Sequence, residues 1–231
     1  MIRVTENFRK IQDLLAQTAA EAGRAKDSIR LLAVSKSKPA SLVLEAVSAG
    51  QREFGENFVQ EGLAKIVEVN RSDLVWHFIG HLQSNKTRPV AEHFDWVHTV
   101  DRLKIAERLS RQRPHHAPDL NLCIQVNIDL EAGKSGVAPD ELAVLAAAVA
   151  GLPKLKLRGL MCIPAPRDDF EAQREPFRRL ALLAEALAHA GIETDTLSMG
   201  MTADYRAAIH EGATIVRIGT ALFGARETGK A

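Results

Sequence analysis

Short apolar segments alternate with helix-like segments along most of this 231-residue chain, and that alternation constrains the fold more than any other feature. The apolar segments are rich in leucine and β-branched residues and are mostly apolar on both faces, as in strands of a parallel sheet covered by helices. Eight can be delimited, at residues 29–35, 52–55, 74–80, 96–100, 120–127, 155–163, 194–198 and 214–218. Eight βα units in a chain of this length predict an α/β fold, a single closed (β/α)8 TIM-type barrel.

An extra N-terminal helix is predicted before the first strand, with Thr5 as its N-cap. Its apolar residues recur at helical spacing: Phe8, Ile11, Leu15 and Ala19. After the seventh strand, Thr202 is expected to begin a helix that stops at Gly212. The alternative, a Rossmann-like open sheet, lacks a G-x-G-x-x-G motif after the first strand. The sequence has no internal repeat, linker or low-complexity segment, so residues 1–231 are expected to form one domain.

Composition excludes several classes of partner. Thirty basic and 29 acidic residues leave a net charge of +1, which gives no electrostatic reason to expect nucleic acid or an anionic membrane. Cys123 and Cys162 lie in apolar, strand-like segments and are expected to be separate buried thiols rather than a disulfide. The N-terminus lacks the apolar region of a secretory signal, and the longest apolar run, residues 142–152, is too short to span a bilayer. The expected location is the cytoplasm.

Lys36 is the strongest candidate for chemistry. In a β/α barrel the functional groups follow the carboxyl ends of the strands, and Lys36 directly follows the apolar segment LLAVS. A lysine held among apolar walls loses ammonium solvation, and its amine becomes nucleophilic toward carbonyl groups. The alternative is a solvated lysine at a strand end, which is what we expect of Lys38.

The last two strand ends indicate a phosphate site. Ser198 ends the seventh strand, Gly200 permits a tight turn, and the eighth strand ends in Arg217-Ile218-Gly219-Thr220. Loops after strands seven and eight commonly bind phosphate in barrel enzymes. The alternative is that these glycines and hydroxyls only shape turns.

Two other motifs do not support a site. Gly133-Lys134-Ser135 resembles the end of a P-loop but lacks the first glycine, so we expect it to cover the barrel mouth after strand five. His77 and His81 have the spacing of a helical metal pair, but their segment is strand-like, so no metal site is predicted.

Six ordered segments carry a resemblance to a known family. They are AVSKSKP, FGENFVQE, IGHLQSNK, GLMCIP, LSMGMTAD and VRIGTALFG. Between residues 33 and 224 they resemble the signatures of the YggS/PROSC-type pyridoxal 5′-phosphate (PLP) homeostasis proteins. The resemblance implies a single barrel of the alanine-racemase type, PLP as cofactor, and a role in intracellular PLP (vitamin B6) and amino-acid homeostasis.

The resemblance also implies roles for individual residues. Lys36 would carry PLP as a Schiff base, Arg217 would face the pyridine nitrogen, and Asn57 and His81 would line the ring pocket. The phosphate would be held through hydroxyls and backbone N–H groups of Ser198, Gly200, Met201, Gly219 and Thr220. The chain departs from the family pattern at Thr202, where serine is frequent, and at Phe58, where tyrosine is usual.

Three functions fit these features: a PLP carrier or regulator, a PLP-dependent amino-acid racemase, and a class I aldolase that uses Lys36 without cofactor. The aldolase leaves Arg217 unexplained. Two-base racemisation needs a second acid/base, which related racemases take from an additional β domain, whereas this chain ends at Ala231 and its single tyrosine is Tyr205. An arginine beside the pyridine nitrogen also weakens the ring as an electron sink. We therefore expect a monomeric carrier without efficient catalysis, with amino acids and PLP-accepting apo-enzymes as candidate partners.

Overall fold

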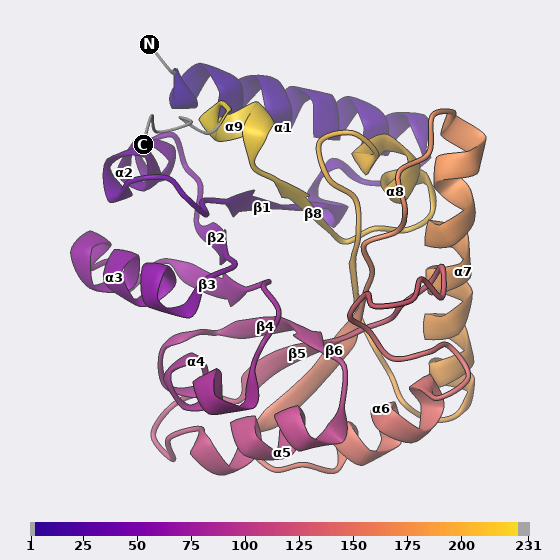
Figure 1. Ribbon diagram of the computed structural model, residues 1–231. Helices are drawn as coiled ribbons and strands as arrows, with labels where there is room; N and C mark the ends of the chain where they lie inside the picture. The colour runs from indigo at the N-terminus through magenta and orange to yellow at the C-terminus, as the bar shows by residue number, and fades with distance from the viewer. Residues whose placement is uncertain (1–2, 226–231) are drawn as a thin grey trace.

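The eight strands close into one parallel barrel in chain order (Figure 1). A computed structural model describes residues 3–225. The strands are β1 (Arg30–Val34), β2 (Glu53–Glu56), β3 (Val75–Phe78), β4 (Trp96–Val100), β5 (Leu120–Gln125), β6 (Leu155–Met161), β7 (Thr196–Ser198) and β8 (Ile215–Ile218). Because β1 pairs with both β2 and β8, the sheet has no open edge. The predicted barrel is confirmed, and every strand lies within or one residue beyond its predicted segment.

Helices cover the outside of the barrel (Figure 1). They are α1 (Val4–Glu21), α2 (Ala40–Ser48), α3 (Val59–Val69), α4 (Thr87–His93), α5 (Leu103–Gln112), α6 (Leu142–Ala150), α7 (Phe170–His189), α8 (Tyr205–His210) and α9 (Thr220–Phe223). The predicted N-terminal helix is α1, which lies beside α9, and the Asn7 side-chain amide donates to the Leu222 carbonyl. Within residues 3–225, no helix combines the length and apolar character needed to cross a membrane.

Two helix starts differ from the prediction. Thr5 lies inside α1, which begins at the buried residue Val4, so burial of an apolar side chain rather than capping sets this end. Thr202 lies in a turn, and α8 begins three residues later, at Tyr205. The Asp204 carboxylate accepts a hydrogen bond from the Met201 N–H, which holds residues 201–204 in that turn.

Apolar side chains fill two separate layers. The larger core lies between the barrel and its helices, where alternate strand residues such as Leu31, Ala33 and Phe54 point outward. Two smaller clusters line the barrel interior, Leu32 with Ile79 and Ile215, and Trp96 with Cys123 and Met161. Both cysteines are buried free thiols, as predicted, and burial raises the pKa of each to about 12.

Candidate functional site

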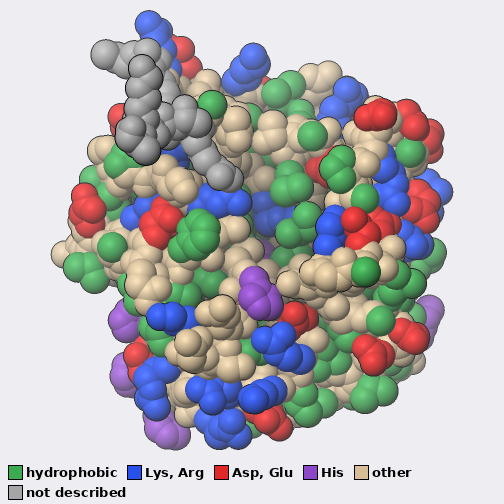
Figure 2. Space-filling view, in the orientation of Figure 1, with side chains coloured by type: hydrophobic (Ala, Val, Ile, Leu, Met, Phe, Trp, Pro, Cys, Tyr) green, Lys and Arg blue, Asp and Glu red, His purple; other side chains and the backbone are tan. Residues whose placement is uncertain are grey.

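The nine residues predicted for the site lie at the carboxyl ends of five strands that are neighbours in the barrel, β7, β8, β1, β2 and β3. In a β/α barrel these ends form one rim, so distant parts of the chain meet there. Figure 2 shows a hollow near the middle of the molecule, with Lys or Arg side chains beside it. The fold therefore groups the predicted residues on one face of the barrel.

Lys36 lies in a tight turn after β1. The Lys38 N–H donates to the Ser35 carbonyl over 3.1 Å, and Ser37 has a φ of +59°. The register of β1 against β8 places Ala33 opposite Ile218, which brings this turn beside Gly219 and Thr220. Thr220 is exposed, as the first residue of α9. The predicted covalent group and one of the two predicted phosphate loops are thus neighbours.

Arg217 occupies the barrel interior under the rim. Its Nη1 donates to the Ser198 carbonyl over 2.6 Å and to Ser198 Oγ over 3.0 Å, and its Nη2 donates to the Cys162 carbonyl over 2.9 Å. Burial lowers the pKa of this guanidinium. The three acceptors are neutral groups, so these bonds fix the guanidinium plane without neutralising its charge.

Two buried histidines extend this network across the barrel, and the sequence did not single out either as part of a site. His98 Nδ1 lies 2.8 Å from Ser198 Oγ, and His98 Nε2 lies 2.9 Å from His77 Nδ1. His77 Nε2 faces Glu53 Oε2 at 3.3 Å, an electrostatic contact rather than a well-aligned hydrogen bond. Burial lowers the pKa of both histidines, so both are neutral near pH 7.

The carboxylate at the end of this network sets the direction of its hydrogen bonds. Burial raises the pKa of Glu53, but interactions with His77 and Arg30 outweigh it and leave the pKa below its ordinary value. An ionised Glu53 favours the proton on His77 Nε2, so His77 Nδ1 accepts from His98, and His98 Nδ1 accepts from the Ser198 hydroxyl. The Ser198 hydroxyl thus has its partners inside the barrel, and its contact with phosphate stays a prediction.

The loop after β7 approaches α8 closely at Gly200. Its φ is +90°, and a Cβ there would lie 2.6 Å from that of Ala208, so this position requires glycine. The Gly200 carbonyl accepts from the Arg217 N–H over 3.0 Å, which ties the loop to β8. The Met201 N–H donates to Asp204 Oδ1 over 2.6 Å, so a phosphate using this donor would displace a carboxylate.

Asn57 and His81 line one cavity of about 240 Å³ at the rim, together with Asn127, Lys134 and Ser135. The segment after strand five thus borders this cavity at the rim, and its covering of the mouth stays a prediction. His81 is exposed, and its Nδ1 lies 3.1 Å from Ser135 Oγ. Asn57 Oδ1 is buried without a hydrogen-bond partner, although a buried acceptor is normally satisfied.

These features fit an anionic ligand with a reactive carbonyl and a polar ring. The turn of Lys36 supplies an amine, Arg217 a fixed positive charge, and Asn57 an unsatisfied acceptor at the cavity. PLP has all three properties, so the residues present suit the cofactor that the sequence resemblance implies.

Comparisons with known proteins give the same family. Residues 4–227 match the family described as alanine racemase, N-terminal domain. The chain is 56% identical over 229 residues to the pyridoxal phosphate homeostasis protein of Pseudomonas aeruginosa, covering 99% of this chain and 98% of that one. It is 54% identical over 235 residues to the protein of the same name from Escherichia coli, covering 98% of both.

Solved structures agree with the fold. PipY of Synechococcus elongatus, described with PLP bound, is 38% identical with a TM-score of 0.85, covering 96% of this chain and 100% of that one. Alanine racemase from Corynebacterium glutamicum is 18% identical with a TM-score of 0.72, a likeness of fold alone. The match covers 99% of this chain but 63% of that racemase. With its barrel, its ordered motifs and these full-length relatives, the chain belongs to the alanine racemase N-terminal domain family.

Proposed function

We propose that this protein binds PLP at the carboxyl rim of its barrel and acts in cytoplasmic PLP and amino-acid homeostasis as a monomeric carrier or regulator. The observation that carries the proposal is the adjacency of the Lys36 turn to the loop of Gly219 and Thr220, next to a buried guanidinium. The names of the full-length relatives, and the PLP bound in PipY, support the same ligand. Amino acids and apo-enzymes that accept PLP are the proposed partners.

Each site residue has one proposed task. Lys36 binds the cofactor aldehyde covalently, and Asn57 and His81 border the ring. Ser198, Gly200, Met201, Gly219 and Thr220 bind the phosphate, and Ser198 also holds the guanidinium of Arg217. When bound, PLP supplies an electrophilic aldehyde and an electron-accepting ring.

Arg217 argues against efficient catalysis. A guanidinium stays protonated, so Arg217 facing the pyridine nitrogen would donate to that atom instead of favouring its protonation, and the ring would accept electrons less well. At the strand ends, Asn57, Asn127 and Arg217 cannot exchange protons near neutral pH, so we take His81 as the acid/base candidate besides Lys36 itself. Tyr205 faces a different cavity, lined by Asn7, Ile11 and Leu14 of α1, on the outside of the barrel.

The alternative, a racemase-like enzyme, is tested by α-proton exchange. The PLP-loaded protein is incubated in deuterated water with a panel of L- and D-amino acids, and deuterium incorporation is followed by mass spectrometry. We expect the PLP absorption to shift without sustained exchange. Multiple-turnover exchange that is lost in His81→Ala would replace the carrier assignment with an enzymatic one.

A further inference from the structure

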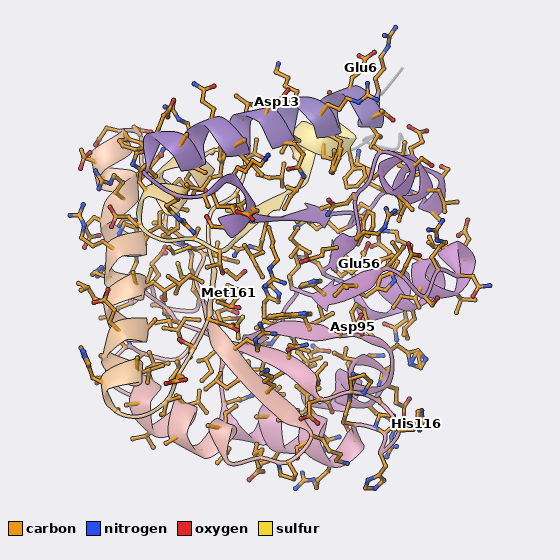
Figure 3. All side chains as sticks on the ribbon, turned by 180° about the vertical axis from the view of Figure 1, so that it is seen from behind. Glu6, Asp13, Glu56, Asp95, His116 and Met161 are labelled. Carbon is orange, nitrogen blue, oxygen red and sulfur yellow. The ribbon has the colours of Figure 1, made fainter. Side chains whose placement is uncertain are left out.

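A buried ionic cluster lies behind Lys36, on the outer side of the barrel. Lys65 of α3 places its Nζ 2.7 Å from Glu56 Oε1 and 2.7 Å from Glu61 Oε1. The Lys65 side chain is 6% exposed and that of Glu56 is fully buried. Figure 3 shows Glu56 at the end of β2, on the side of the barrel that α3 covers. The three charges therefore lie between α3 and the end of the strand that precedes it.

This cluster binds the backbone on both sides of Lys36. Lys65 Nζ donates to the Ser35 carbonyl over 2.5 Å, and the Ser35 hydroxyl donates to Glu56 Oε1 over 2.6 Å. On the other side of the lysine, the Ser37 N–H donates to Glu61 Oε1. The residues before and after Lys36 are thus held by the same three side chains.

The turn needs such support because of its backbone. Ser37 has a φ of +59°, in the left-handed region that disfavours residues with a Cβ. The Ser37 N–H bond to Glu61 and the Lys38 N–H bond to the Ser35 carbonyl both depend on this conformation. Without the cluster, we expect Ser37 to relax toward negative φ and the turn that carries Lys36 to change shape.

Stability alone is a poor explanation for this cluster. Replacing a buried ion pair with apolar side chains is often neutral or stabilising, because both charges lose their hydration. The second carboxylate oxygen of Glu56, Oε2, is buried without a hydrogen-bond partner, which is a further cost. Burial also raises the pKa of Glu56, whereas the bonds from Lys65 and Ser35 lower it.

We propose that Lys65, together with Glu56 and Glu61, is a positioning group that holds the Ser35–Lys38 turn so that the Lys36 amine meets the aldehyde of bound PLP. The inference rests on the proposed function and extends it to three side chains whose hydrogen bonds reach the residues on either side of Lys36. Its consequence is that covalent capture of PLP depends on the cluster, while recognition of the phosphate does not.

The test compares two ligands that differ at the reacting group. PLP has an aldehyde, and pyridoxine 5′-phosphate has an alcohol there and cannot bond to Lys36. In Lys65→Met, we expect the rate of covalent PLP capture, followed by visible absorbance, to fall about tenfold or more, because the Ser35 carbonyl loses its charge-assisted hydrogen bond. The affinity for pyridoxine 5′-phosphate, measured by calorimetry, should change less than about twofold, because this ligand has no aldehyde for Lys36 to bond.

Two variants of Glu61 test the same role while keeping the buried Lys65. Glu61 is 27% exposed, so Glu61→Ala removes the acceptor of the Ser37 N–H with little risk to folding, while Glu61→Gln keeps an acceptor oxygen. We expect slow capture in Glu61→Ala and near wild-type capture in Glu61→Gln. Adding Ser37→Gly to Glu61→Ala should restore capture, because glycine adopts positive φ without steric cost.

Three results would overturn the positioning role. The first is wild-type capture in both Lys65→Met and Glu61→Ala. The second is an equal fall in the rate of PLP capture and in the affinity for pyridoxine 5′-phosphate, which would assign the cluster to folding or to general binding. The third is failure of Ser37→Gly to rescue Glu61→Ala. A wild-type protein that binds pyridoxine 5′-phosphate but never bonds PLP would instead overturn the proposed function at Lys36.

Discussion

His98 Nδ1 lies 2.8 Å from Ser198 Oγ inside the barrel, although the two residues are 100 positions apart in the chain. Ser198 in turn accepts a bond from Arg217, so His98 supports the guanidinium beneath the rim. Because His98 and His77 are fully buried, this support depends on both imidazoles staying neutral.

Stability should therefore fall in mild acid. The ordinary histidine pKa is 6.5, and burial lowers the pKa of both His77 and His98 in the folded protein. Below that pH the unfolded chain takes up protons that the folded chain does not, so stability is present above about pH 6.5 and lost as pH falls. Each such proton contributes a slope of about 1.4 kcal/mol per pH unit.

Urea unfolding between pH 8 and pH 5 measures this slope. His98→Gln keeps a hydrogen-bonding side chain but does not titrate, so its stability should fall less steeply than that of the wild type, whatever its absolute stability. Parallel pH profiles for the two proteins would show that His98 does not contribute to the acid sensitivity.

Thr220 provides a test of the phosphate loop. Thr220→Val keeps the shape of the side chain and removes its hydroxyl, which should cost roughly 1.5–3 kcal/mol if that group donates to a charged phosphate. We expect PLP affinity to fall about tenfold or more, with little change for pyridoxal, which has no phosphate. Thr220→Ser keeps the hydroxyl and is the matched control. If Thr220→Val weakens both ligands equally, the phosphate lies elsewhere.

The barrel was predictable because its signal is local. Every strand is a short apolar segment followed by a helix-like segment, and a closed parallel sheet with both faces covered produces that pattern. The two incorrect helix starts, at Thr5 and Thr202, depended on capping chemistry, which burial of Val4 and the Asp204–Met201 bond override.

The residues that hold Arg217 and the Lys36 turn in place were not predictable, because their role depends on which elements meet in the folded barrel. His98 shares the barrel interior with Ser198 only after the strands from β4 to β7 have paired in register, and Lys65 meets Ser35 across 30 residues. A polar residue at an alternating position of an apolar strand, such as the histidine in WVHTV, was the available signal. Lys65 gave a similar signal, as a charge among the residues that α3 buries.

Chemical trapping tests the central claim, covalent binding of PLP at Lys36, most directly. The PLP-loaded protein is reduced with borohydride and digested with trypsin, which does not cleave at a modified lysine or at the Lys38–Pro39 bond. An adduct on Lys36 would therefore appear in a peptide spanning residues 31–52 and be located by fragmentation. We predict that this peptide carries the main adduct and that Lys36→Ala, but not Lys38→Ala, abolishes it. An adduct found chiefly on Lys38 or Lys134 would contradict the assignment.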